Sequence, residues 1–229
     1  MKVAVAGAGN VGASIAQELH ENGHEILLIE RDPKAAAHHR VEGVPTRIAD
    51  ACELSAMQAT GLADYDVVIA ATGDDKVNLV VSLLAKTEFA VPRVVARINN
   101  PLNEWLFTEA WGVDVAVSTP RLITALVEEA VSVGDLVRLM RFQQGQASLV
   151  ELTLPEGSPL AGQLVSHLRT PRDAALVAIL RDGKVVLPQP DAPIEGGDEL
   201  FFIATTLEVE GELAQIFQAK PVTGSDAAI

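Results

Sequence analysis

A glycine-rich turn close to the N-terminus has the residue types and the spacing of a phosphate-binding site. It follows the apolar run of residues 2–6 and consists of Gly7, Ala8, Gly9, Asn10, Val11 and Gly12. The first glycine permits a sharp turn, the second lets the backbone approach a pyrophosphate without a Cβ in the way, and the third lets a helix lie close to the strand. The N-terminus of that helix presents free N–H groups and a positive partial charge. The turn therefore predicts a pyrophosphate site.

Glu30 ends the second apolar run and has the spacing of a ribose ligand. It follows residues 26–29, and a carboxylate at this distance from a glycine turn can accept hydrogen bonds from the ribose hydroxyls of an adenosine. The same charge repels a 2′-phosphate, so NADP is disfavoured unless the neighbouring Arg31 offsets the repulsion. The alternative interpretation is that the glycines only make a tight turn between strand and helix.

A strand, a turn, a helix and a second strand must position these residues, and residues 1–118 repeat this pattern. Short β-rich runs alternate with helical patterns of about ten residues, which indicates right-handed βαβ units and an α/β, Rossmann-type parallel-sheet domain. Strands are expected at residues 2–6, 26–29, 46–49, 66–71, 93–98 and 114–117. Helices are expected from Asp32 toward Val41, at 53–60 after Asp50 as N-cap, at 76–88 and at 101–111.

The candidate ligands in this domain all follow expected strands directly. They are the glycine turn, Glu30, Asp50 and the turn Thr72-Gly73-Asp74-Asp75. In such a sheet, ligands bind beyond the carboxyl ends of the strands, where the strand order reverses. Positions far apart in the sequence are therefore expected to converge on one edge of the sheet.

The second half of the chain has a different pattern. Residues 119–144 are expected to form a crossover helix and linker. The helix, at 121–131, is apolar on more than one face, which predicts a homodimer; packing on its own sheet is the alternative. Residues 145–217 are expected to form a small α+β domain, and residues 218–229 a flexible tail. A strand at 136–142 is expected just before the small domain. The domain itself is expected to contain strands at 149–154, 175–180, 185–187 and 199–204, an Asp-Gly hairpin at 182–183 and a closing helix at 207–217.

Composition excludes several classes of partner. The net charge of −14 argues against nucleic acid or an anionic membrane surface, because binding to phosphates relies on an excess of Lys and Arg. The single cysteine, Cys52, excludes an internal disulfide and fits a reducing cytoplasm. No stretch approaches the roughly 20 apolar residues of a membrane helix. We therefore expect a soluble cytoplasmic protein with no direct membrane insertion.

The catalytic groups that an NAD-dependent enzyme needs beside its cofactor do not stand out. Short-chain reductases use a tyrosine followed four residues later by a lysine, but the only tyrosine, Tyr65, has Ile69 at that spacing. No nucleophile elbow, P-loop or carboxylate pair stands out either. The expectation is a non-enzymatic nucleotide sensor, and a small NAD-dependent oxidoreductase or redox sensor is the alternative.

Further segments extend the pattern beyond the glycine turn. They are VAVAGAGNVG, LLIERDP, ADACE, AATGDDKVN, ARINNP and GVDVAVSTP, followed by LVELTLPEGSPLAGQLVSHL, LVAILRDGKVVLPQPD and IEGGDELFFIAT. With these segments in this order over residues 1–217, the chain resembles the RCK or KTN domain regulators of potassium transport, in particular TrkA-like cytosolic subunits of bacterial Trk and Ktr potassium uptake systems. The resemblance implies RCK homodimers, assembled into a ring or paired with a second RCK protein. These would dock on a membrane potassium-translocating subunit at the inner face of the plasma membrane.

The resemblance also implies an adenine nucleotide, NAD(H), ADP or ATP, in the Rossmann site. By position, the glycine turn with Asn10 and Val11 would hold the phosphates, and Glu30 the ribose. The remaining site residues would be Arg31, Asp50 and Ala51 on the adenine side, Thr72, Gly73 and Asp74 at the phosphate end, and Arg97 near the phosphates. Many relatives have an arginine in place of Asn10 that reaches a terminal phosphate of ATP. The uncharged Asn10 therefore favours NAD(H) or ADP.

Some relatives bind cyclic di-AMP at the dimer interface of the C-terminal domain, and others bind a divalent cation. Arg172 and Arg181 could serve an anion in that domain, although both are also typical of ordinary surface charges. A cyclic-dinucleotide receptor is therefore a further alternative, and the spacing of the acidic residues selects no metal site.

Overall fold

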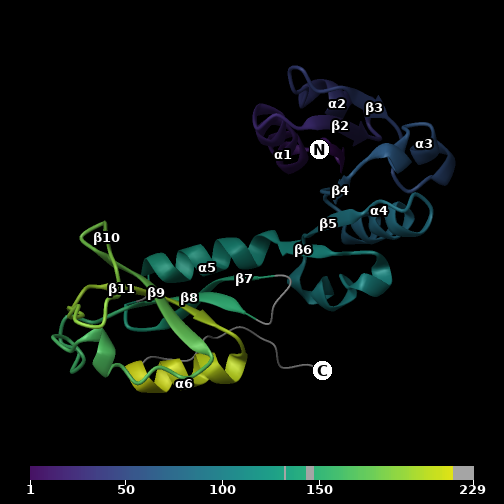
Figure 1. Ribbon diagram of the computed structural model, residues 1–229. Coiled ribbons are helices and arrows are strands. Elements are labelled where there is room, and N and C mark those ends of the chain that lie inside the picture. The colour runs from purple at the N-terminus through teal and green to yellow at the C-terminus, as the bar shows by residue number, and fades with distance from the viewer. Residues whose placement is uncertain (132, 143–146, 219–229) are drawn as a thin grey trace. The chain divides into compact units, whose positions relative to one another are not determined.

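The chain divides into two compact units, residues 1–121 and 122–229, in a computed structural model (Figure 1). The structure describes residues 1–131, 133–142 and 147–218. Within these ranges no helix is both long and apolar enough to cross a membrane. The expected tail lies outside the described residues except for Gln218. The expected domain limits after residues 118, 144 and 217 stay predictions.

A six-stranded parallel sheet forms the centre of the first unit, as its sequence predicts. The strand order is β3-β2-β1-β4-β5-β6, so the order reverses between β1 and β4. Both neighbours of β1 pair with it in parallel. The strands are β1 Lys2–Ala6, β2 Glu25–Glu30, β3 Thr46–Ile48, β4 Val67–Ala70, β5 Arg93–Ile98 and β6 Val115–Ser118.

Helices cover both faces of this sheet, which is why the central strands β1 and β4 are apolar from Val3 and Val67 onward. On one face Val5 and Leu28 pack with Ala16 of α1. On the other face Ala6 packs in a cluster with Val81 of α4. The helices are α1 Asn10–Glu21, α2 Pro33–His38, α3 Leu54–Gln58 and α4 Asp75–Thr87, and the 3-10 helices are η1 Leu62–Asp64, η2 Pro101–Leu106 and η3 Glu109–Trp111.

Two local predictions were wrong. The single helix expected at 101–111 is two 3-10 helices, η2 and η3, because Phe107 leaves helical geometry to reach the core, where it is 6% exposed. Asp50 is not the N-cap of α3. Its carboxylate accepts the N–H of Cys52 in a tight turn, and Glu53 occupies the N-cap position without a side-chain hydrogen bond.

The second unit contains a five-stranded antiparallel sheet in the order β10-β9-β11-β8-β7. β7 lies within the segment expected as crossover helix and linker, but it pairs with β8 and is part of this sheet. The elements of the second half are α5 Thr119–Val131, β7 Leu136–Arg141, β8 Ser148–Thr153, η4 Val165–His167, β9 Ala174–Arg181, β10 Lys184–Val186, β11 Glu199–Ala204 and α6 Leu207–Phe217.

The expected hairpin and closing helix of the second half are both present. Asp182 and Gly183 have φ angles of 50° and 70°, the left-handed conformations that a two-residue hairpin turn between paired strands requires. α6 packs Leu213 and Phe217 into the core of this unit. The rings of Phe217 and Phe202 lie 5.5 Å apart. The small domain therefore has its own core on one face of the sheet.

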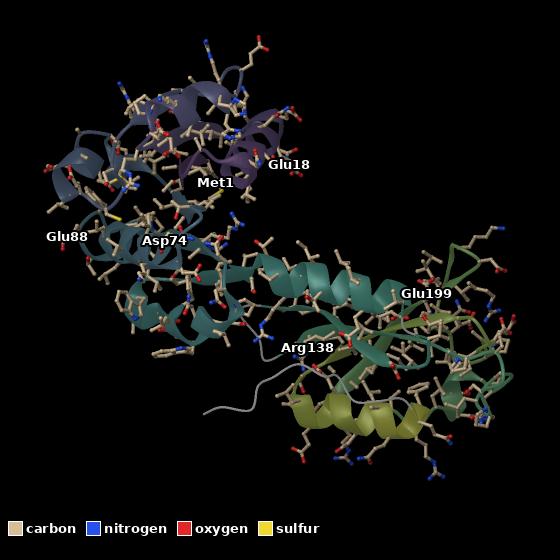
Figure 2. All side chains as sticks on the ribbon, turned by 180° about the vertical axis from the view of Figure 1, so that it is seen from behind. Met1, Glu18, Asp74, Glu88, Arg138 and Glu199 are labelled. Carbon is tan, nitrogen blue, oxygen red and sulfur yellow. The ribbon has the colours of Figure 1, made fainter. Side chains whose placement is uncertain are left out.

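A buried ion pair ties α6 to β7. Arg138, which Figure 2 labels, donates from Nη2 to Oε2 of Glu210 at 2.6 Å. The side chain of Glu210 is only 3% exposed. Removing one partner of such a pair leaves a buried charge and typically costs about 3–5 kcal/mol. The pair therefore fixes the position of α6 against β7.

Candidate nucleotide-binding site

The glycine turn between β1 and α1 has the close contacts that only glycine allows. Gly7 has a φ of 101°, and a Cβ there would lie 3.0 Å from the backbone of Thr72. A Cβ on Gly12 would overlap the carbonyl oxygen of Gly7. By contrast, a Cβ on Gly9 would meet nothing within 4 Å. Gly7 and Gly12 are therefore needed for packing, whereas Gly9 borders open space into which a ligand can enter.

The N-terminus of α1 has no side-chain cap, whereas that of α4 has one. Gly9 is the N-cap of α1 and supplies no side-chain hydrogen bond to the first turn. At α4 the carboxylate of Asp74 accepts the N–H of Lys76 at 2.9 Å. Figure 2 labels Asp74. Because unsatisfied N–H groups and the helix dipole attract negative charge, the first turn of α1 is the better phosphate site of the two.

Glu30 is held against the glycine turn by two backbone N–H groups. Its Oε2 accepts the N–H of Ala8 at 2.8 Å, and its Oε1 accepts the N–H of Asp32 at 2.9 Å. Each carboxylate oxygen has further lone pairs. The side chain thus joins the end of β2 to the turn after β1, and it can accept further hydrogen bonds there.

Arg31, Asp50 and Ala51 lie together beyond β2 and β3. Arg31 Nη1 is 3.5 Å from Asp50 Oδ2, and the arginine side chain is 77% exposed. An exposed pair of this kind contributes at most about 1 kcal/mol. Ala51 is buried. Partial burial raises the pKa of the neighbouring Cys52 thiol, and the negative charge of Asp50 raises it further.

The turn after β4 contributes Thr72, Gly73 and Asp74. The Thr72 N–H donates to Oδ1 of Asn78 at 2.9 Å, and the hydroxyl donates to the same oxygen at 2.6 Å. A Cβ on Gly73 would meet nothing within 4 Å, so this side of the turn is open. Thr72 also lies against Gly7. The turn is therefore part of the same wall as the glycine turn.

The side chain of Arg97 binds a residue outside the group of candidates. Its Nε donates to Oγ1 of Thr119 at 3.3 Å, at the beginning of α5. Three contacts connect the remaining candidates, namely Asp50 with Arg31, Glu30 with Ala8 and Gly7 with Thr72. The structure thus brings these candidates to one edge of the sheet, at the reversal of strand order, whereas the guanidinium of Arg97 hydrogen-bonds to Thr119.

Sequence reasoning placed Asp75 in the turn after β4 without recognising its buried role, and it missed Asn78 altogether. Asn78 is 0% exposed and Asp75 is 6% exposed. Although burial by itself raises the pKa of Asp75, hydrogen bonds from Asn103, Asn99 and Asn100 hold that pKa below its ordinary value. A signal was present in the sequence, because Asn78 is a polar residue among the apolar positions of α4. Such a residue indicates a buried hydrogen-bonding role.

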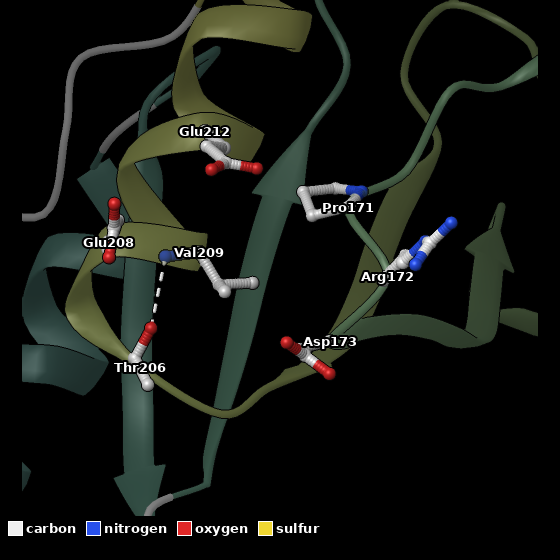
Figure 3. Close-up of a pocket in the computed structure, with 7 residues that line it drawn as sticks. All are labelled: Pro171, Arg172, Asp173, Thr206, Glu208, Val209 and Glu212. Atoms are coloured by element: carbon white, nitrogen blue, oxygen red, sulfur yellow. Dashed lines mark hydrogen bonds between the residues drawn. The ribbon is translucent and has the colours of Figure 1, made fainter.

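The second unit has a hollow of about 440 Å³ beside the N-terminus of α6, shown in Figure 3. Its lining residues are Pro171, Arg172, Asp173, Thr206, Glu208, Val209 and Glu212. Arg172 is thus accompanied by three acidic side chains, which disfavour an anion. No group of three or more His, Cys, Asp or Glu side chains in the described residues could hold a metal ion.

Arg181 is engaged elsewhere in the same unit. It donates to both carboxylate oxygens of the buried Asp198, at 2.7 and 2.8 Å, and to Glu195 and the carbonyl of Pro193. The hydrogen bonds to Asp198 raise the pKa of Arg181. This guanidinium therefore secures the loop before β11 and has little capacity left for an anion.

Two solved structures share the fold of this chain. The GsuK channel bound to NAD has a TM-score of 0.66 and 14% sequence identity over 97% of this chain, which spans 40% of that chain. GsuK bound to ADP has a TM-score of 0.51 and 15% identity over 58% of this chain, and 35% of that chain is covered. At these identities the similarity concerns the fold alone.

The family is shown by matches along the sequence. Residues 3–119 match the TrkA-N domain, and residues 149–210 match the TrkA-C domain. The Trk system potassium uptake protein TrkA of Mycobacterium tuberculosis strain H37Rv is 62% identical over 216 residues, which cover 94% of this chain and 98% of that protein. The chain therefore belongs to the family of the Trk system potassium uptake protein TrkA.

Proposed function

We propose that the chain is a nucleotide-sensing regulatory subunit of a membrane potassium uptake system. The observation that carries this proposal is the 62% identity to a Trk system potassium uptake protein over nearly the full length of both chains. The glycine turn, the free first turn of α1 and the fixed carboxylate of Glu30 support the nucleotide part. The chain then acts by binding a nucleotide, without catalysing a reaction on it.

The nucleotide is proposed to lie across the reversal of strand order between β1 and β4. Its pyrophosphate would bind the N–H groups of residues 9–12, and its adenosine ribose would bind Glu30. The adenine would lie beside Asp50 and Ala51, and Thr72-Gly73-Asp74 would contact the far end of the ligand. Arg97 would reach a phosphate only by leaving Thr119.

NAD(H) or ADP fits this site better than ATP. Asn10, in the first turn of α1, is exposed and uncharged. The carboxylate of Asp74 adds negative charge near the far end of the site, which disfavours a third phosphate. The GsuK channel has structures with NAD and with ADP, which supports the same two ligands for this chain.

Homodimerisation is proposed to use α5, with a ring or a pairing with a second RCK protein as the larger assembly. Three apolar side chains of this helix, Ile123, Leu126 and Val127, are 57%, 61% and 55% exposed in the single chain. Exposed apolar patches of this kind mark protein interfaces. The assembly would bind a potassium-translocating membrane subunit from the cytoplasmic side.

Regulation would follow from a shift between two conformations of the assembly. A nucleotide that binds one conformation more tightly raises its population, and the shift in free energy equals the difference in binding free energy. The membrane subunit would open or close according to which conformation it binds.

Purification of the tagged chain from its native membranes tests the proposal. We expect a potassium-translocating membrane protein to co-purify, and an adenine nucleotide to be released on denaturation and identified by mass spectrometry. A control with exposed Glu42 changed to alanine should retain both. Recovery of the chain without any membrane transporter would contradict the regulatory function, and steady NADH consumption with a simple carbonyl substrate would favour the oxidoreductase alternative.

A further inference from the structure

A buried polar network lies behind the Thr72 turn, outside the residues proposed to contact the nucleotide. Asn78, in α4, accepts from the N–H and the hydroxyl of Thr72 through Oδ1. Its Nδ2 donates to the carbonyl of Thr72 at 3.2 Å and to the carbonyl of Arg97 at 2.8 Å. One fully buried amide thus uses both of its donors and its acceptor to hold the turn after β4 against the end of β5.

Asn99 and Asp75 extend the network to the end of β5. Asn99 Nδ2 donates to the carbonyl of Thr72 at 3.0 Å and to Oδ1 of Asp75 at 3.0 Å. Asp75 also accepts the backbone N–H groups of Asn99 at 2.6 Å and Asn100 at 3.0 Å. Because hydrogen bonds to an ionised carboxylate are stronger than neutral ones, Asp75 is the strongest member of the network.

The network continues from Asp75 to an exposed surface. Nδ2 of Asn103, in η2, donates to Oδ2 of Asp75 at 2.8 Å. The same short helix carries Leu102 and Trp105, whose side chains are 81% and 73% exposed. A series of hydrogen bonds therefore leads from the Thr72 carbonyl through Asn99 and Asp75 to Asn103, and so to the helix that bears the exposed tryptophan.

We propose that Asp75, Asn78 and Asn99 are positioning residues of the nucleotide site, and that Asn103 transmits the position of the Thr72 turn to η2 and Trp105. The proposal rests on the proposed nucleotide site. Thr72 lies against Gly7 in the glycine turn, so a ligand bound in the open space beside Gly9 and Gly73 lies next to Thr72. Its carbonyl is shared by Asn78 and Asn99, so a shift of the turn changes both hydrogen bonds.

The coupling acts in both directions. If the nucleotide changes the conformation of η2, then anything that fixes η2 changes nucleotide affinity by the same factor. A partner that binds the exposed surface of Leu102 and Trp105 would thus change the affinity of the site for the nucleotide. The positioning residues affect affinity through Thr72 without touching the ligand.

Trp105 provides the measurement. The sequence has two tryptophans, so Trp111→Phe leaves Trp105 as the only one in an otherwise full-length chain. We expect NAD or ADP to change Trp105 emission, with a midpoint equal to the dissociation constant from calorimetry. Calorimetric binding without a change in Trp105 emission would overturn the coupling and leave the proposed nucleotide site intact. Absence of calorimetric binding by NAD, ADP and ATP would overturn the nucleotide site, and this inference with it.

Two variants separate positioning from transmission. Asp75→Asn keeps the shape but replaces one acceptor oxygen by a donor that faces other donors, so nucleotide affinity should fall about tenfold or more and the Trp105 response should be lost. Asn103→Ala should keep affinity within roughly threefold and greatly reduce the Trp105 response. Asn22→Ala, an exposed asparagine at the end of α1, is the matched control.

The results of these variants decide both parts of the proposal. Far-UV circular dichroism and melting establish that each variant is folded. A folded Asp75→Asn variant with wild-type affinity would overturn the positioning role. A full Trp105 response in Asn103→Ala would overturn transmission, and because Asn103 is half-buried in a short surface helix this variant gives an answer even if Asp75→Asn does not fold.

Discussion

Glu30 has a role in the fold that also suits its proposed role in binding the ribose. Its two oxygens accept the N–H groups of Ala8 and Asp32, which fixes the carboxylate beside the glycine turn before any ligand binds. A carboxylate that is already fixed loses little conformational entropy on binding, so more of its hydrogen-bond energy contributes to the affinity. Asn10 has the opposite character, since it is exposed and uncharged and gives a terminal phosphate nothing to pair with.

Glu30→Ala should weaken binding of NAD and ADP about tenfold or more, because hydrogen bonds to a charged group contribute about 1.5–3 kcal/mol. Isothermal titration calorimetry of the full chain measures the change. Glu42→Ala, an exposed acid in the loop before β3, controls for loss of negative charge alone. Unchanged affinity in the Glu30 variant would remove the ribose assignment.

Asp75 makes the stability of the first unit depend on pH. Its hydrogen bonds hold its pKa below the ordinary value of about 3.9. The stabilisation from the ionised form is therefore fully present above about pH 4, and is lost as the pH falls from there through the lower pKa of the folded state. The loss reflects the protons that the unfolded chain binds first.

Urea unfolding of the wild type and of Asp75→Asn, followed by tryptophan fluorescence, measures this dependence. Both tryptophans lie in the first unit, so the signal reports that unit. We expect the variant to be less stable at neutral pH and the difference to shrink below about pH 4. If the difference in unfolding free energy between wild type and Asp75→Asn stays constant from neutral pH to below about pH 4, the carboxylate charge is not the cause of that difference.

At the scale of elements, the site is made where short turns meet at the ends of adjacent strands. The turn after β1 contacts the end of β2 through Glu30 and the turn after β4 through Thr72. The two helices that start there differ, because α4 is capped by Asp74 and α1 has no side-chain cap. One helix N-terminus thus has a side-chain cap from within the fold, and the other has none.

Gly9→Ala and Gly12→Ala should separate binding from folding. Gly9 has a φ of −73° and open space beside it, so alanine should leave the melting temperature nearly unchanged but obstruct a pyrophosphate and lower its affinity. A Cβ on Gly12 overlaps the Gly7 carbonyl oxygen, so this variant should lose about 1–3 kcal/mol of stability. Calorimetry with NAD and thermal melting distinguish the two, and equal effects of both variants on melting would contradict this division.

At the scale of the whole molecule, each unit has its own sheet and core, while α5 leaves apolar side chains uncovered. The cores are formed by separate clusters of buried residues. A unit of about 100 residues gains only modest stability from its own core. An interface that covers α5 would therefore add to the stability of the chain as well as determine its assembly.

Leu126→Asp should convert a dimer of the full chain to a monomer, because a carboxylate in an apolar interface is left without a partner. Leu126 is 61% exposed in the single chain, so the fold itself should tolerate the change. Multi-angle light scattering gives the mass. Val185→Asp, at a position that is 69% exposed in the β9–β10 hairpin, should remain dimeric, and a dimer that persists in Leu126→Asp would exclude this face as the interface.

Much of the first unit could be predicted because its determinants are local. Apolar runs set the strands, the glycine turn follows β1 and Glu30 ends β2, as expected. In the second unit, Asp182-Gly183 likewise makes the expected hairpin between β9 and β10. The local errors arose where a residue had two possible uses. Asp50 has the type of an N-cap residue, but it caps its own turn through Cys52 instead. Periodicity alone also could not reveal that Phe107 interrupts the segment at 101–111.

The sequence by itself determined the alternation of strands and helices, the parallel sheet and the glycine turn between β1 and α1, because these depend on residue type and on spacing within short segments. Only the tertiary structure decided which helix N-terminus stays free and that Arg97 turns toward Thr119. It also decided that Asn78, Asn99 and Asp75 support the Thr72 turn. Those features depend on hydrogen bonds between segments far apart in the chain, such as Asn99 to Thr72, and the geometry of such bonds exists only when the sheet has formed.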